Sequence, residues 1–523
     1  MNAQAVLQVT QVNPYAEAEK LFDLLRAFLR CEASWRMTHS DMERELGERG
    51  RELLCELYQA WLDQQMPAEA DGPVVDAEGQ LRSEARTGHK RNLETTFGTV
   101  RVHRTGYATP GKPSLHPFDG QLNLPDDKYS LEVRRRVAEE VSKNAFEDVV
   151  ETLDRHTGAH VPKRQTEQLA CRAAQDFNAF YLTRRQEGPG SHEASGALQI
   201  ITCDGKGVVM HEDDLREATR KAAKQQRHKL DTRLAQGEKK HRKRMATVAA
   251  VYTIEPFERT PAQMLQMMAR QPVEPALPAR PRPEEKRLWA SLIQDPREVL
   301  EEAFKDALDR DPHGKKRWAS VVDGNEKQLA ILEELAAHHG RELTLILDIY
   351  HVSEYLWKAG HVFHAKGTPE LEVWVLERMG RLLRGEVSQV AAGMTRSATK
   401  RGLSNKKKRP VIKCAKYLLK YKHYLRYDQY LAAGLPIGSG VVEGGCRHLI
   451  NDRLGKTGAR WRLTDAEAVL RLRALRSSGD FDEYWHFHEA QQYKRTHQAR
   501  YANGRVPPVN TPKPPTLKIV ETT

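Results

Sequence analysis

The chain has 523 residues, of which 83 are Lys or Arg and 71 are Asp or Glu, giving a formal charge of +12 at pH 7. A chain of this length exceeds what one hydrophobic core supports, so several domains are expected. The positive charge favours a polyanionic partner such as nucleic acid, although net charge alone suits an ordinary basic protein equally well.

Cysteine use and hydropathy argue against other classes of protein. The six cysteines are scattered without a CxxC pair, which disfavours a disulfide framework and a zinc ribbon. No apolar run approaches the roughly 20 residues of a membrane span, and the N-terminus lacks a signal-peptide pattern. We therefore expect a cytoplasmic protein without a membrane partner.

The N-terminal part divides into a helical region and a β-containing region. Apolar residues recur at helical spacing over residues 16–65, which predicts a pair of long helices within a region spanning 1–67. Their expected role is core packing or self-association. In the next region, residues 68–130, the stretch 93–107 predicts a β-hairpin that turns near Gly98.

Residues 131–187 form a third region with helix-turn-helix character. Three helices are predicted, and the second and third flank a break near Gly158. In such a motif the helix after the break would present Lys163, Arg164, Gln165 and Gln168 to the major groove of DNA. Helical hairpins that bind no DNA are equally common, so DNA binding and plain packing both stay open.

A Gly- and Ser-containing linker at residues 188–196 separates these regions from a predicted α/β domain. Beyond it apolar strands alternate with helices, which is typical of an α/β layer. One expected helix runs from about residue 284 to 309, and a strongly basic run ends at Arg244. The predicted strands lie within the stretches 197–210, 245–254 and 317–325, and within one that starts at Leu343.

Several of these strands are expected to end on a carboxylate. The first should stop at Asp204, and later strands end at Asp323 and Asp348. A fourth acid, Glu443, lies in the segment VVEGGCRHLINDRLGKTGARW, at the start of a basic helical run. Mg²⁺ prefers carboxylate oxygens, and two such ions can support in-line displacement at phosphorus. Turns also recruit Asp for hydrogen bonding, so each acid alone is weak evidence.

Four motifs carry a family resemblance. CDGKGVVM, VVDGN, LDIYHVSEYLWKAGH and GSGVVEGGCRHLINDRLGKTGARW together resemble bacterial insertion-sequence transposases of the ISKra type, relatives of the Mutator-like DDE enzymes. The resemblance spans about residues 93–480. It implies an RNase H-like fold, two Mg²⁺ ions for which Mn²⁺ can substitute, and cleavage and joining of DNA strands.

The resemblance places a metal-binding triad on Asp204, Asp323 and Glu443. Related enzymes carry a signature of Cys or Asp, two residues and His between the second acid and the glutamate, and Asp348 and His351 fit it. Both Asp323 and Asp348 follow a predicted strand. Because Asp348 and His351 fit this separate signature, Asp323 is the preferred second ligand, and Asp348 stays the alternative because it too ends a predicted strand.

Cations near the acids are expected to contact DNA. Lys206 lies two residues after the first acid, where it would meet a phosphate, although a plain surface lysine is the simpler interpretation. After Glu443 cations are mixed with an aromatic residue, as expected for phosphate contact and base stacking, with an exposed helical face as the alternative. The predicted contacts there are Arg447, His448, Arg453, Lys456, Arg460 and Trp461.

The predicted fold is an α/β RNase H-like catalytic domain at residues 197–476, preceded by mainly helical DNA-binding and self-association regions. A helical insertion within the catalytic domain is implied at about 366–430. The C-terminal extension, residues 477–523, ends in a Pro-rich, polar stretch and is expected to be disordered from about residue 494.

The predicted function is a DNA transposase that cleaves and joins the ends of an insertion sequence by metal-dependent phosphoryl transfer. Its partners would be double-stranded DNA, as terminal repeats and target, and further copies of the chain in a homodimer or higher oligomer at the nucleoid. The alternatives are a catalytically inactive, transposase-derived DNA-binding regulator and a structure-selective DNA nuclease. The presence of all three acids weighs against the regulator.

Overall fold

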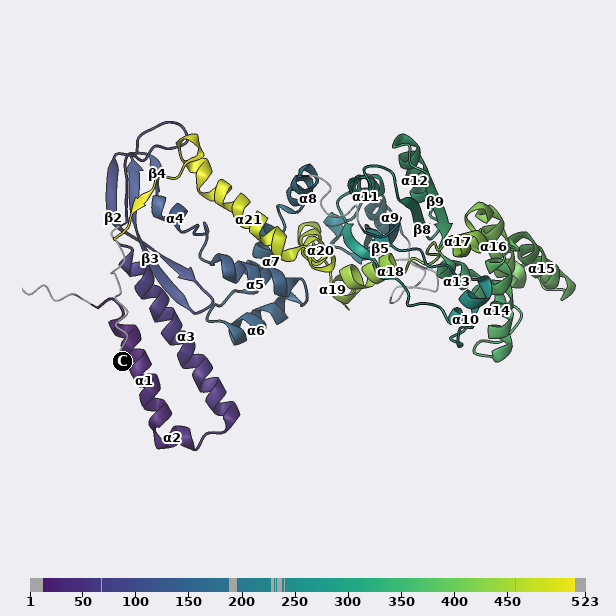
Figure 1. The fold of residues 1–523 in the computed structure, drawn as a ribbon, viewed down its shortest axis with the longest axis horizontal. Coiled ribbons are helices and arrows are strands. Elements are labelled where there is room, and N and C mark those ends of the chain that lie inside the picture. Colours follow the sequence, from purple (N-terminus) through teal and green to yellow (C-terminus); the bar gives the residue numbers. More distant parts are fainter. Residues whose placement is uncertain are drawn as a thin grey trace, which may run out of the picture. The chain divides into compact units, whose positions relative to one another are not determined.

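The structure is a computed structural model, whose elements are shown in Figure 1. It describes residues 13–66, 68–187, 195–226, 230, 232, 238, 240–456 and 458–512. Contacts divide the chain into two units, so each has its own core. The first unit combines Met1–Asp176 with Asp482–Thr523, and the second comprises Phe177–Phe481.

The first unit begins with a long helical hairpin. Helix α1 (Ala16–Arg30) leads through the short α2 (Glu32–Trp35) into α3 (His39–Gln64), as the helical periodicity predicted. Thr38 accepts a hydrogen bond from the backbone N–H of Asp41 and so caps the start of α3. Only the end of α3 is deeply buried, because Ala60 and Leu62 pack onto the neighbouring sheet.

That sheet contains the predicted hairpin and a third strand. Strands β2 (Glu84–Glu94), β3 (Thr99–Thr109) and β4 (Lys112–Leu115) form one antiparallel sheet. Its core includes Leu93 and Val102. The hairpin turn at Gly98 is therefore confirmed, and the short helix α4 (Pro117–Gln121) follows the sheet.

The helix-rich part of the first unit has the predicted three helices. They are α5 (Leu131–Val141), α6 (Phe146–His156) and α7 (Lys163–Ala173). Between α6 and α7, Gly158 lies so close to the hairpin turn that an added Cβ would come within 2.4 Å of the Phe97 carbonyl oxygen. Glycine is therefore required at this break for packing.

The C-terminal segment returns to the first unit. Helix α21 (Phe481–Thr496) precedes β10 (Val509–Asn510), which pairs with β1 (Glu69–Ala70), and Tyr501 is buried. The predicted disorder from about residue 494 is thus wrong for the described residues up to 512. Proline and polar residues suggested a solvated tail, but strand pairing and a buried aromatic residue order it. Residues 513–523 lie outside the described residues.

The second unit is built around a mixed five-stranded sheet (Figure 1). Its strand order is β7-β6-β5-β8-β9; β5 to β7 are antiparallel neighbours, while β8 and β9 run parallel to β5. Together with its helices this makes an α/β unit, as predicted. The strands are β5 (Leu198–Val209), β6 (Lys243–Ile254), β7 (Glu284–Ser291), β8 (Arg317–Val322) and β9 (Leu343–Leu347).

Two sequence predictions for this sheet are wrong. The expected helix from about residue 284 is instead β7 followed by α11 (Pro296–Arg310), because Asp295 caps that helix and the apolar run before it pairs with β6. The first strand does not stop at Asp204. It continues to Val209 because β6 pairs along its whole length, whereas its pairing with β8 ends at Thr202.

Helices surround the sheet. Helix α11 packs on β5 and β6, and α20 packs on β7. The implied insertion at 366–430 is helical: it contains α14 (Pro369–Leu383), α15 (Val387–Lys400), α16 (Asn405–Lys420) and α17 (Tyr427–Ala432). The remaining helices are α8 (Phe177–Gln186), α9 (Glu217–Gln225), α10 (Pro261–Met268), α12 (Glu326–His338), α13 (Ile349–Gly360), α18 (Gly440–Gly445), α19 (Asp452–Leu454) and α20 (Leu463–Ser478). In the described part of the chain, no helix is both long and apolar enough to span a membrane.

Candidate functional site

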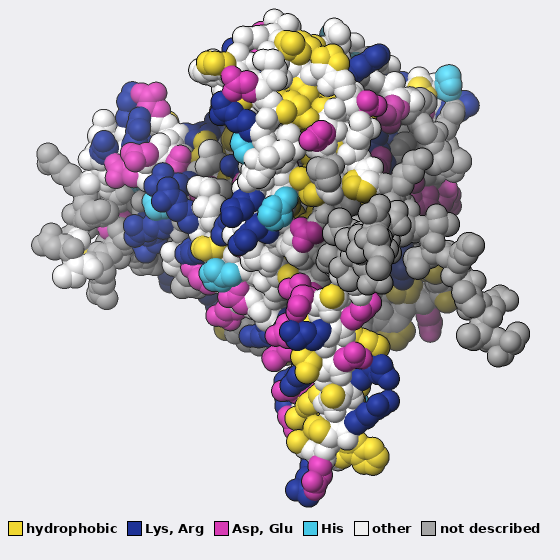
Figure 2. All heavy atoms as spheres, turned by 90° about the vertical axis from the view of Figure 1, so that its left-hand side faces the viewer, with side chains coloured by type: hydrophobic (Ala, Val, Ile, Leu, Met, Phe, Trp, Pro, Cys, Tyr) yellow, Lys and Arg dark blue, Asp and Glu magenta, His cyan; other side chains and the backbone are white. Residues whose placement is uncertain are grey.

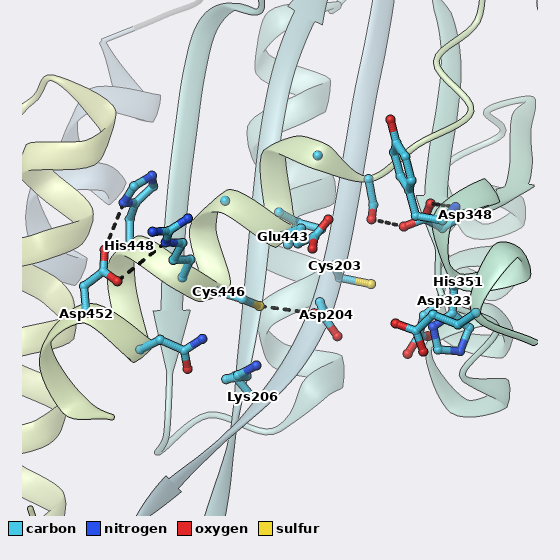
Figure 3. Close-up of a pocket in the computed structure, with 18 residues that line it drawn as sticks. Cys203, Asp204, Lys206, Asp323, Asp348, His351, Glu443, Cys446, His448 and Asp452 are labelled. Atoms are coloured by element: carbon cyan, nitrogen blue, oxygen red, sulfur yellow. Dashed lines mark hydrogen bonds and ion pairs between the residues drawn. The ribbon is translucent and has the colours of Figure 1, made fainter. Parts of the chain in front are cut away.

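Four predicted acids line one cavity of about 720 Å³ in the second unit (Figure 3). Asp204 lies on β5, Asp323 directly follows β8, Asp348 follows β9 and Glu443 lies on α18. The parallel strands β5, β8 and β9 bring the first three acids to one edge of the sheet. Residues separated by more than 200 positions therefore share one concave site.

Asp204 is held by donors on two sides. Its Oδ1 accepts a hydrogen bond from the backbone N–H of Gly205 at 2.6 Å, and its Oδ2 accepts one from the Sγ of Cys446 at 3.2 Å. Burial, reinforced by the charge of Asp204, raises the pKa of the Cys446 thiol far above its ordinary value. A protonated Cys446 thiol can donate to the Asp204 carboxylate and is a poor nucleophile.

Tyrosines of the helical insertion hold the loop that carries Asp323. The hydroxyl of Tyr417 donates to the Asp323 carbonyl at 3.1 Å, and that of Tyr421 donates to the Gly324 carbonyl at 2.7 Å. Both tyrosines lie on or directly after α16. The carboxylate of Asp323 accepts from the N–H of Asn325 at 2.9 Å and is only half-buried. The insertion thus fixes the backbone of the loop and leaves its side chain facing the cavity.

Asp348 is more deeply engaged than Asp323. Its side chain caps α13 by accepting from the N–H of Tyr350 at 2.8 Å, and it also accepts from the hydroxyl of Ser439. It is 6% exposed, and burial raises the pKa of its carboxyl group. Because Ser439 immediately precedes α18, Asp348 ties the end of β9 to the helix that carries Glu443.

Glu443 is presented by a short helix that packs closely on the sheet. Val442 and Gly445 are buried while Glu443 is exposed. An added Cβ at Gly445 would lie 2.6 Å from Leu288 Cδ1, so glycine permits α18 to approach β7. A π-helical turn at Cys446–Asn451 follows directly. Such turns are frequent at functional sites, and the sequence had no signal for this one.

The donor set suits a hard divalent cation. Asp204, Asp323 and Glu443 offer carboxylate oxygens from three elements to one cavity, which is the chemistry that Mg²⁺ prefers. Over the described residues, no three His, Cys, Asp or Glu side chains are placed to share one ion as they stand. His351 also lines the cavity, beside Asp323 in Figure 3.

Several predicted DNA contacts lie at this cavity or beside it. Lys206, Arg447 and His448 line the cavity of the acids, and His448 pairs with Asp452 at 3.2 Å. A second cavity of about 290 Å³ is lined by cations and no acid among the described residues. Its cations are Lys206, Lys456, Arg460, Arg242 and Lys243. Arg242 and Lys243, which were not among the predicted DNA contacts, belong to the basic run that leads into β6, and Lys243 is the first residue of that strand.

Two predicted contacts are corrected by burial. Arg453 and Trp461 are 4% and 6% exposed, and the guanidinium of Arg453 lies 4.8 Å from the centroid of the Trp461 ring. The backbone of Trp461 bonds to the end of β5, donating to the Val209 carbonyl at 3.1 Å. These side chains pack inside the unit, so they offer no surface to DNA.

The helix-turn-helix residues belong to the first unit. Lys163 and Arg164 are exposed on the first turn of α7, and Gln165 is half-buried. Lys163 forms an ion pair with Glu147 of α6. The structure therefore brings these three residues together on one helical turn but provides no further evidence for DNA contact.

Comparison with known proteins gives no family for this chain. Neither a protein-family model nor a curated protein sequence matches it.

Proposed function

We propose that the chain is a DDE transposase, which cleaves and joins the ends of an insertion sequence by metal-dependent phosphoryl transfer. The observation that carries this proposal is the single cavity that Asp204, Asp323 and Glu443 line together. The resemblance to ISKra-type transposases had placed a metal-binding triad on the same three residues.

The sheet of the second unit supports an RNase H-like assignment. Three antiparallel strands are followed by two parallel ones in the order β7-β6-β5-β8-β9. The acids lie on the first strand in sequence, after the fourth, and on a later helix. This agrees with the strand, strand, helix order expected for the triad.

In the proposed reaction Asp204, Asp323 and Glu443 would hold Mg²⁺, and the bound metal would supply activation of the attacking oxygen and stabilisation of the leaving oxygen. Lys206 and Arg447 would neutralise the phosphates beside the acids. The thiol of Cys446 keeps Asp204 oriented, and the tyrosines of α16 keep the Asp323 loop in place. These residues preorganise the site before DNA enters.

We propose Asp323 rather than Asp348 as the second metal ligand. The carboxylate of Asp348 already accepts from Tyr350 and Ser439 and is nearly buried, whereas Asp323 is half-buried and accepts from one backbone N–H. Using Asp348 as a metal ligand would break its hydrogen bond with Ser439, which connects the end of β9 to the segment before α18. The role of Asp348 is then to position Glu443.

The test uses labelled duplex DNA carrying the two element ends, with Mg²⁺, and compares wild type with Asp204→Asn, Asp323→Asn and Glu443→Gln. Each variant is expected to lose at least about 100-fold in cleavage, because the loss of even an outer-shell partner of a metal costs about 10 to 100-fold. Glu354→Gln is the matched control, since Glu354 lines the same cavity but pairs with Lys358 on the surface.

The outcomes separate the proposal from its alternatives. Full cleavage by Glu443→Gln would overturn the metal-site assignment. Cleavage without joining by the wild type would identify a structure-selective nuclease, and binding without cleavage would identify a DNA-binding regulator. If Asp348→Asn loses cleavage while Asp323→Asn cleaves fully, Asp348 is the second metal ligand and Asp323 is not.

A further inference from the structure

Tyr350 is an exposed aromatic residue at the acid cavity, the cavity of about 720 Å³ that the four acids line. Exposure alone marks no site, because eighteen large apolar side chains are exposed among the described residues, and eight of them lie on the hairpin of α1 to α3 (Figure 2). Tyr350 is 50% exposed, and it is the one residue of this set that lines the acid cavity. Its exposure therefore faces the place where the reaction is proposed to occur.

The position of Tyr350 is fixed by its backbone and by a glycine. It lies on the first turn of α13, where its N–H donates to Asp348 Oδ1 at 2.8 Å. The preceding N–H, that of Ile349, donates to the Ile437 carbonyl at 3.0 Å. An added Cβ at Gly438 would lie 2.7 Å from Tyr350 Cε2, so glycine lets the chain pack against one edge of the ring. The ring is thus held in place before any ligand binds, which favours binding.

The acid cavity is poorly suited to hold DNA by charge alone. Six Asp or Glu side chains line it, whereas Lys206 and Arg447 are the only Lys and Arg among its described lining residues. The six acids are Asp204, Asp323, Asp348, Glu354, Glu443 and Asp452. Carboxylates repel a phosphate backbone, but they do not repel the neutral face of a base. An aromatic residue that stacks on a base would therefore offset part of this repulsion.

Stacking on a wall of the cavity requires a base with a free face. Inside a duplex both faces of a base are covered by its neighbours, so a stacked and paired base offers no face to Tyr350. A base that leaves the stack does. Enzymes that act on an unstacked nucleotide hold its base between aromatic or apolar side chains, which offsets the cost of unstacking.

We propose that Tyr350 stacks on an unpaired base next to the phosphate that the acids cut. The inference deepens the proposed function and rests on it, since it places a nucleotide of the same DNA in the acid cavity. Tyr350 then positions the substrate and gives the site a preference for DNA that is unpaired at the cut. Trp461, for which base stacking was predicted, is 6% exposed and cannot take this role.

Binding of two DNAs to the full-length chain in the presence of Mg²⁺ tests this proposal. The probes are a short duplex with one unpaired strand end and the same duplex fully paired. The wild type should bind the unpaired end about 5- to 100-fold more tightly, and Tyr350→Ala should remove this preference. Tyr350→Phe keeps the ring and should retain the preference, because the Tyr350 hydroxyl has no hydrogen-bond partner within the described part of the chain.

Trp357→Ala is the matched control. Trp357 is also an exposed aromatic residue of α13, at 36% exposed, and it does not line the acid cavity. This variant should keep the preference for the unpaired end. Raising the salt concentration from about 50 to 200 mM weakens phosphate contacts. The ratio of the two affinities should persist in the wild type, because stacking does not depend on phosphate charge.

Photocrosslinking reports the contact directly. A 5-iodouracil base in the unpaired end, which crosslinks to an aromatic side chain stacked on it, should attach to Tyr350 in the wild type and in Asp204→Asn. A wild type that binds neither DNA or binds both equally, or an unchanged preference in Tyr350→Ala, would overturn the proposal. If the wild type also cleaves element ends in that case, the proposed function stands without the stacking contact. A wild type that crosslinks through Tyr350 but cleaves no element end would overturn the proposed function and retain the contact.

Discussion

Two histidines of the first unit, the buried His497 and the half-buried His116, have lowered pKa values. His497 is 4% exposed, and its Nε2 donates to the Leu124 carbonyl at 2.9 Å. Burial lowers its pKa from the ordinary 6.5 to about 4. Burial together with the nearby charge of Arg104 lowers the pKa of His116 to about 3. Both side chains are therefore neutral in the folded unit at neutral pH.

The first prediction concerns acid destabilisation. Below pH 6.5 the unfolded chain binds a proton at His497, whereas the folded chain does not. The neutral His497 therefore contributes fully to the free energy of unfolding above pH 6.5, and this contribution is lost as pH falls toward 4. Moving from about pH 7.5 to about pH 5 should cost about 2 kcal/mol from this residue.

Urea unfolding at the two pH values measures the loss in free energy of unfolding. Hydrogen exchange at the amides of α21 reports the same loss locally. His497→Gln keeps a donor for Leu124 but cannot titrate, so it should show a smaller loss on acidification. An identical pH dependence in this variant and the wild type would contradict the assignment.

In helix α18, the adjacent glycines Gly444 and Gly445 differ in how closely the rest of the chain packs against them. An added Cβ at Gly445 would meet the buried Leu288, while one at Gly444 would meet nothing within 4 Å. Both glycines follow Glu443 directly. Comparing alanine substitutions at Gly444 and Gly445 therefore separates the effect of packing α18 on β7 from the effect of alanine on helix stability.

The second prediction compares these glycines. Gly445→Ala should displace α18 from β7 and reduce Mg²⁺-dependent DNA cleavage by up to about 100-fold, since a shift of about 1 Å at a reacting centre can cost that much. Gly444→Ala should lose clearly less activity than Gly445→Ala, because its added Cβ meets no atom within 4 Å, even though Gly444 lines the same cavity. Cleavage assays with equal losses in the two variants would show that backbone flexibility, and not docking, is what glycine provides.

At the scale of the whole molecule, the first unit is closed by the last part of the chain. His488 of α21 donates to the buried Asp176 at 2.7 Å. Arg495 of the same helix donates to both carboxylate oxygens of Asp176, at 2.6 and 2.8 Å. Tyr484 and Trp485 on the same helix are also buried. The core of this unit therefore depends on residues some 300 positions away in the sequence.

The third prediction is that ending the chain at Asp480 unfolds the first unit. Losing a large buried aromatic side chain costs about 3 to 5 kcal/mol, and several are removed together, which matches the total stability of about 5 to 15 kcal/mol of a typical domain. Hydrogen exchange should show lost protection in β2 and β3 and retained protection in β5. Ending the chain after Pro512 is the control and should change neither. Protection of β2 in the shorter chain would contradict the role of α21.

Local patterns determined much of the fold. Helical periodicity predicted the hairpin helices, and apolar runs predicted β6, β8 and β9, because each element must bury one face whatever its partner. Asp323 and Asp348 were predicted as site residues because each directly follows an apolar strand. The residue after such a strand lies at the edge of the sheet where the strand ends. The triad of Asp204, Asp323 and Glu443 was instead implied by the family resemblance, and the structure places all three at one cavity.

Only the tertiary structure decided features that depend on distant partners. Strand β5 passes Asp204 because β6 pairs with it throughout, and β7 is a strand because β6 is its neighbour. Arg453 and Trp461 have the composition of a DNA-contacting surface, yet both are buried. Within the Pro-rich C-terminal stretch, the described residues up to 512 include β10, which pairs with β1. Sequence by itself encodes which faces are apolar, whereas contacts between residues hundreds of positions apart decide what covers them.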